Sequence, residues 1–122
     1  SEDTLADSIA VGKPRNYRKA INAVKESKGE MVNVADEEIL EMMRVLGRNT
    51  GVFGEPAGVA GLAGLRKMVD KGVIKPEEQV VTVITGNGLK DIDNARRAAG
   101  DPLEVEPDLE LLEKEFKDQN IV

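Results

Sequence analysis

The loop at residues 85–91 (TGNGLKD) combines groups that could do chemistry. Thr85 offers a hydroxyl, and Gly86 and Gly88 leave room for a flat ligand to come close. Asn87 alone separates the glycines, so the spacing fits neither a phosphate-binding P-loop nor the dinucleotide fingerprint, which needs a third glycine. Three interpretations follow: a wall for a planar ring, a simple anion or nucleotide site, or an ordinary glycine-rich turn.

The composition removes several other chemistries. The 122 residues include no Cys and no His. Disulfides, thiolate nucleophiles, imidazole metal ligands and a Ser-His triad are therefore excluded, and we expect no metal site. Carboxylates, lysines, hydroxyls and the backbone remain.

A buried strand is expected to position the loop. Residues 79–84 (QVVTVI) form a nearly continuous β-branched run, typical of a strand buried on both faces. Ligands bind at the carboxyl ends of such strands, where Thr85 stands. With a second strand at residues 31–34 and a possible edge strand at 103–105, the sequence predicts an α/β fold: a short, mostly parallel sheet flanked by helices.

Four helices are expected around this sheet. Apolar spacing predicts the first over residues 14–27, with Gly29 as a left-handed cap, and the second after Asp36 as N-cap, ending near residues 49–51. The third opens at Pro56 and runs toward residue 72, and the last spans residues 109–116.

The third helix is unusual because it carries three interior glycines, Gly58, Gly61 and Gly64. Each costs about 1 kcal/mol of helix propensity relative to alanine. A close backbone approach is expected to offset this cost, either by the sheet or by a flat ligand.

Length and charge indicate one small domain with an acidic tail. Residues 101–122 hold eight acids and two bases, which account for the whole net charge of −6. We divide the chain into an α/β segment at 1–100 and an acidic tail with a short helix at 101–122. The neutral body argues against a nucleic-acid partner. No apolar run reaches the ~18 residues of a membrane span, so we expect no membrane contact and a cytoplasmic location.

Four segments, in order, resemble the C-terminal part of the threonine synthase family. They are residues 4–14 (TLADSIAVGKP), 34–39 (VADEEI), 53–65 (FGEPAGVAGLAGL) and 85–91 (TGNGLKD). The resemblance implies part of a tryptophan synthase β-like fold and a pyridoxal-phosphate-dependent lyase of threonine biosynthesis, which converts O-phosphohomoserine and water to threonine and phosphate.

The resemblance also implies roles for three residues. The hydroxyl at the position of Thr85 hydrogen-bonds the pyridine nitrogen of pyridoxal phosphate, Gly86 lies against the ring, and Glu55 is a possible contact beside the pocket. Lys90 is interpreted as a surface or capping lysine.

In the family, the Schiff-base lysine and the phosphate loop belong to the part that precedes residue 4. We therefore expect this chain alone to hold the cofactor weakly and to lack activity. Its expected partner is that preceding portion of the enzyme, or a second copy of itself in a homodimer. The alternative function is a stand-alone, non-catalytic α/β module that binds a partner chain or small ligand.

Overall fold

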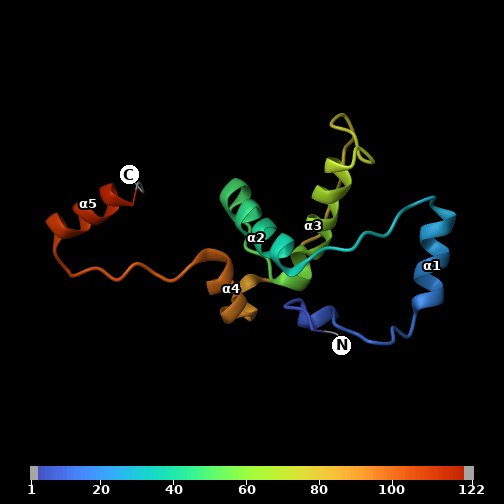
Figure 1. The fold of residues 1–122 in the computed structure, drawn as a ribbon, viewed down its shortest axis with the longest axis horizontal. Coiled ribbons are helices and arrows are strands. Elements are labelled where there is room, and N and C mark those ends of the chain that lie inside the picture. Colours follow the sequence, from blue (N-terminus) through green and yellow to red (C-terminus); the bar gives the residue numbers. More distant parts are fainter. Residues whose placement is uncertain (1–2, 120–122) are drawn as a thin grey trace.

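The computed structural model describes residues 3–119, and this part of the chain is helical. Its helices are α1 (Tyr17–Glu26), α2 (Asp36–Thr50), α3 (Pro56–Asp70), α4 (Ile92–Ala99) and α5 (Leu109–Asp118), with short 3₁₀ turns η1 (Asp7–Ile9) and η2 (Gly88–Lys90). Figure 1 shows α2, α3 and α4 gathered at the centre, with α1 and α5 on opposite sides.

The predicted α/β fold is wrong for the described residues. Residues 31–34, 80–84 and 103–105 are not in strands, and β pairing within residues 3–119 is limited to one antiparallel bridge between Gly54 and Asn87. A strand exists only when a neighbour accepts and donates its backbone hydrogen bonds. These β-prone segments have no such neighbour here, so their composition alone does not make a sheet.

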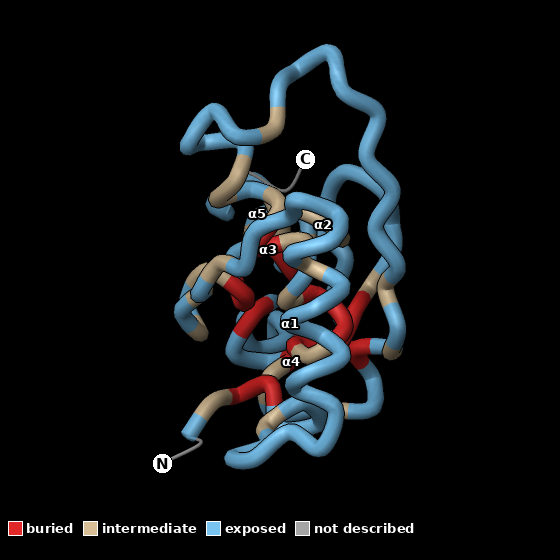
Figure 2. Tube along the Cα trace, turned by 90° about the vertical axis from the view of Figure 1, so that its right-hand side faces the viewer, coloured by how far each residue is buried: buried red, intermediate tan, exposed pale blue. Residues whose placement is uncertain are grey.

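The central helices enclose a small core. Its buried apolar residues come from the N-terminal segment and α2, α3 and α4: Leu5, Ala6, Ile39, Leu40, Met42, Met43, Val59, Ala63 and Ala98. Figure 2 shows the buried positions confined to this middle region. Because α1 and α5 contain no buried residue, they add little to the core.

The predicted helices at α1, α2, α3 and α5 are confirmed, but two caps differ. Lys28, not Gly29, is left-handed after α1 (φ 53°), while the Gly29 N–H bonds the Val24 carbonyl at 2.8 Å. Asp36 is the first residue of α2 rather than its cap. Its carboxylate instead accepts hydrogen bonds from the Thr4 hydroxyl (2.6 Å) and the Leu5 N–H (3.1 Å).

The α4 helix has no counterpart among the sequence predictions. Asp91 caps it by accepting from the Asn94 N–H at 3.1 Å. None of the helices in the described part of the chain is long and apolar enough to cross a membrane.

Candidate functional site

The Thr85 loop lies against the start of α3. The Glu55 N–H donates to the Gly86 carbonyl at 3.0 Å, and the Gly88 N–H donates to the Phe53 carbonyl at 2.9 Å. These two bonds flank the Gly54–Asn87 bridge. Two segments some thirty residues apart in sequence are therefore fixed to each other by their backbones.

Glycines make this close contact possible. A Cβ on Gly58 would lie 3.0 Å from the Gly86 nitrogen and 3.3 Å from the Thr85 nitrogen. A Cβ on Gly88 would lie 2.5 Å from the Phe53 ring, and one on Gly86 would overlap the Glu55 carboxylate. Side chains at these positions would push the loop away from α3.

The three residues singled out from the sequence have different environments. Glu55 is 7% exposed and Gly86 is half-buried, and the two are in contact. Thr85 is exposed. The structure thus groups Glu55 with Gly86 and leaves the adjacent Thr85 exposed.

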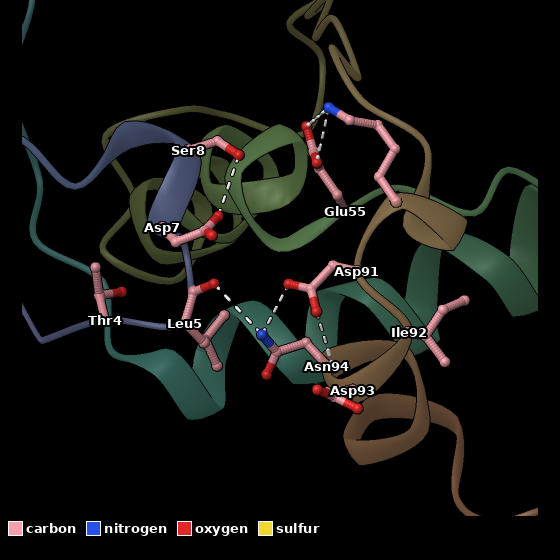
Figure 3. Close-up of a pocket in the computed structure, with 10 residues that line it drawn as sticks. Thr4, Leu5, Asp7, Ser8, Glu55, Asp91, Ile92, Asp93 and Asn94 are labelled. Atoms are coloured by element: carbon pink, nitrogen blue, oxygen red, sulfur yellow. Dashed lines mark hydrogen bonds and ion pairs between the residues drawn. The ribbon is translucent and has the colours of Figure 1, made fainter.

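An open cavity of about 450 Å³ lies beside Glu55, between the N-terminal segment and the start of α4 (Figure 3). Four carboxylates line it, those of Asp7, Glu55, Asp91 and Asp93, together with one lysine, Lys90. Thr85 and Gly86 are not among its lining residues. The charge of this cavity is therefore unfavourable for an anion such as a phosphate group.

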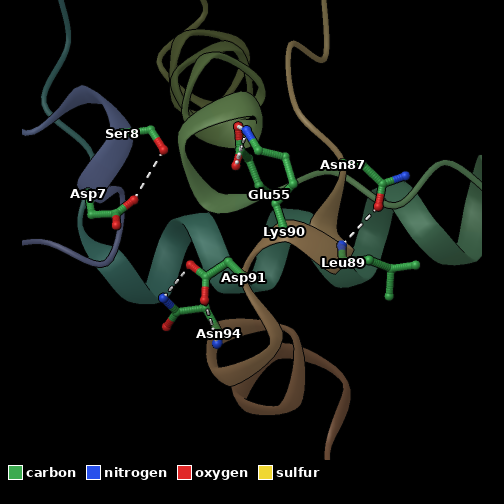
Figure 4. Close-up of polar contacts among 8 residues, drawn as sticks. All are labelled: Asp7, Ser8, Glu55, Asn87, Leu89, Lys90, Asp91 and Asn94. Atoms are coloured by element: carbon green, nitrogen blue, oxygen red, sulfur yellow. Dashed lines mark hydrogen bonds and ion pairs between the residues drawn. The ribbon is translucent and has the colours of Figure 1, made fainter.

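A polar network holds the walls of the cavity together. The Asn94 side-chain amide donates to Asp91 Oδ2 at 2.8 Å and to the Leu5 carbonyl at 3.5 Å. The Lys90 Nζ contacts both carboxylate oxygens of Glu55, at 3.2 Å and 3.1 Å (Figure 4). The sequence predictions include Asp91 only as the last residue of the 85–91 loop, give it no role, and do not mention Asn94. An Asp at the start of a helix is the capping signal that could have assigned Asp91 its role.

Comparison of the sequence with known proteins places the chain in a family. The family model for pyridoxal-phosphate dependent enzymes matches residues 1–86. The chain therefore belongs to the pyridoxal-phosphate dependent enzyme family. Within it, the chain is related to threonine synthases.

Three of these relatives show the extent of the match. The threonine synthase of Methanocaldococcus jannaschii is 40% identical over 116 residues, 95% of this chain and 29% of that enzyme. That of Synechocystis sp. is 46% identical over 114 residues (92% and 29%), and that of Bacillus sp. (strain ULM1) is 48% identical over 93 residues (76% and 26%). The chain spans between a quarter and a third of the length of these relatives.

Pyridoxal phosphate has a flat ring with a polar nitrogen at its edge, and the residue of the loop that is open to such an edge is the exposed Thr85. The space beside Gly86 is filled by the Glu55 carboxylate. The acidic cavity does not suit the phosphate group of the same molecule.

Proposed function

We propose that this chain supplies the pyridine-side wall of the cofactor pocket in a threonine synthase, the enzyme that forms threonine and phosphate from O-phosphohomoserine and water. The observation that carries the proposal is the exposed Thr85 next to Gly86, on a loop held against the start of α3. The relationship to threonine synthases supports the same assignment.

In this proposal Thr85 hydrogen-bonds the pyridine nitrogen and Gly86 lies against the ring. Pyridoxal phosphate, when bound, withdraws electrons from the reacting carbon of the substrate. A neutral hydroxyl does not hold the ring nitrogen protonated as a carboxylate would, so the withdrawal is weaker. Thr85→Asp is therefore expected to alter the reaction outcome more than the cofactor affinity.

We further propose that this chain works only with another polypeptide portion and is inactive alone. The cavity beside Glu55 carries four carboxylates and one lysine, so these residues do not provide a phosphate cradle. The β-branched segment also leaves apolar side chains open, with Val81 90% and Val83 73% exposed. The proposed partner is the remaining portion of a threonine synthase, and self-association is the alternative.

A cofactor titration of the Thr85→Val variant tests the proposal. The chain is mixed with the M. jannaschii threonine synthase truncated to lack the segment that this chain matches, and pyridoxal phosphate binding is followed by its absorbance shift. Loss of one hydrogen bond of ~1–1.5 kcal/mol predicts roughly tenfold weaker binding for Thr85→Val.

Thr82→Val is the matched control, because it removes a hydroxyl three residues earlier in the same segment. It is expected to bind as the wild type does. Equal binding by wild type and Thr85→Val in the mixture would exclude Thr85 as the ring partner. An absence of any absorbance shift at millimolar cofactor would contradict the wall assignment itself.

A further inference from the structure

Lys90 is the cation that pairs with the buried carboxylate of the site. The two residues are 35 positions apart, and the lysine reaches Glu55 from η2 across the start of α3 (Figure 4). The Glu55 side chain is 9% exposed and that of Lys90 is 63% exposed. Since the carboxylate is the desolvated partner, it depends on the lysine far more than a surface acid would.

The paired carboxylate lies against Gly86, the residue that follows Thr85. It covers Gly86 so closely that a Cβ there would overlap it, and the Glu55 N–H donates to the Gly86 carbonyl at 3.0 Å. Movement of the Glu55 side chain would therefore change the surroundings of the turn that carries Thr85.

The proposed hydrogen-bond partner of the pyridine nitrogen is a hydroxyl, and a carboxylate in its place would act differently. A carboxylate is a stronger acceptor than a hydroxyl and favours a protonated ring nitrogen beside it. The Glu55 carboxylate lies against Gly86, the residue that follows Thr85, so a released Glu55 side chain would be an alternative acceptor at this turn. With both of its oxygens held by Lys90, the carboxylate is already occupied.

We propose that Lys90 is a positioning residue: it fixes the Glu55 carboxylate over Gly86 and withholds it from the ring edge that Thr85 faces. The withholding of Glu55 from the ring edge rests on the proposed function. The fixing of Glu55 over Gly86 concerns the cofactor-free chain and rests on the contacts alone.

Amide NMR of the full, cofactor-free chain tests the positioning. Lys90→Met is expected to shift the Thr85 and Gly86 amide resonances, and Lys90→Arg to restore them because it keeps the charge. In a Glu55→Gln background, Lys90→Met should cause no further shift. Lys71→Met, which removes an exposed lysine at the other end of α3, is the matched control and should leave both amides unmoved.

Two results would overturn the positioning role. One is unchanged Thr85 and Gly86 amides in Lys90→Met, and the other is a shift of equal size in the wild-type and Glu55→Gln backgrounds. Lys90→Met alone could fail to fold, because it leaves the buried Glu55 charge without its partner. In that case the Thr85 and Gly86 amides are compared between Glu55→Gln and the double variant Glu55→Gln with Lys90→Met, which carries no charge at either position.

Cofactor titration in the mixture of this chain with the truncated enzyme tests whether Lys90 withholds Glu55 from the ring edge. Thr85→Val should weaken binding about tenfold with Lys90 present, and by less than about twofold in a Lys90→Met background, where Glu55 takes over as acceptor. A tenfold loss in both backgrounds would refute the withholding role. Absence of binding by the wild type contradicts the proposed function and with it the ring-edge role, while the amide result still decides the positioning.

Discussion

Glu38 shows how a single side chain joins three parts of the molecule. Its carboxylate accepts hydrogen bonds from Lys67 Nζ on α3 (2.8 Å) and from the Ala35 N–H before α2 (2.6 Å). Lys67 also donates to the Asn33 carbonyl at 2.9 Å. The hydrogen bond from Lys67, then that from Ala35, lower the pKa of Glu38 below its ordinary value of 4.5, against the opposing effect of burial.

This lowered pKa predicts an acid-sensitive contribution to stability. A carboxyl with a lower pKa when folded stabilises the fold above its unfolded value, here 4.5, and loses that contribution as the pH falls through the folded value. The free energy of unfolding, measured in urea, should therefore fall less between pH 7 and pH 3 for Lys67→Met than for wild type. Lys71→Met should retain the wild-type difference, and an unchanged difference in Lys67→Met would contradict the prediction.

At the scale of elements, the glycines of α3 match the segments packed against it. Gly58 faces the Thr85–Gly86 backbone, and a Cβ on Gly64 would lie 3.2 Å from Val32 Cγ1. A Cβ on Gly61 would meet nothing nearer than Thr82 Oγ1 at 3.9 Å. The expected close approach to α3 is thus present, but it is made by two unpaired segments and a turn rather than by a sheet.

Gly58, which has the tightest contacts, and Gly61, which has the loosest, predict opposite effects of substitution by alanine. Gly61→Ala should raise the free energy of unfolding by up to about 1 kcal/mol, because helix propensity improves without a clash. Gly58→Ala should lower it by about 1–3 kcal/mol, since its Cβ would meet backbone atoms that cannot rotate away. Urea unfolding checks both, and equal gains at the two positions would show that the loop is not packed against α3.

At the scale of the whole molecule, the core is confined to the middle of the chain. Helices α1 and α5 lie apart from it on opposite sides (Figure 1). Val81 and Val83 leave most of their surface exposed. Apolar surface of this kind associates in water. This supports the proposal of a partner chain or self-association.

Sedimentation velocity tests self-association directly. The wild-type chain is expected to sediment above its monomer mass at high concentration, and Val81→Lys with Val83→Lys to return it to monomer. Val73→Lys, at a valine that is 47% exposed beyond α3, is the control and should leave association unchanged. A monomeric wild type would rule out self-association and leave the remaining enzyme portion as the proposed partner.

The site was predictable from sequence only in part. The FGEPAG and TGNGLKD motifs indicated Glu55, Gly86 and Thr85, and the structure brings Glu55 against Gly86. The pairing of Lys90 with Glu55 was not predicted, because nothing in the local sequence shows that side chains 35 positions apart will meet. The proposed division into residues 1–100 and an acidic tail at 101–122 stays a prediction, and residues 120–122 of that tail lie outside the described part.

The sequence by itself determined the helices α1, α2, α3 and α5 but not α4, because helix hydrogen bonds join residues four apart and helix starts and stops depend on nearby residues such as Pro56 and Gly51. It also determined the family through motifs in order along the chain. Only the tertiary structure decided that residues 31–34 and 80–84 are not strands here and that Lys90 holds Glu55. The physical reason is the same for both: strand pairing and ion pairing depend on which distant groups come together in space.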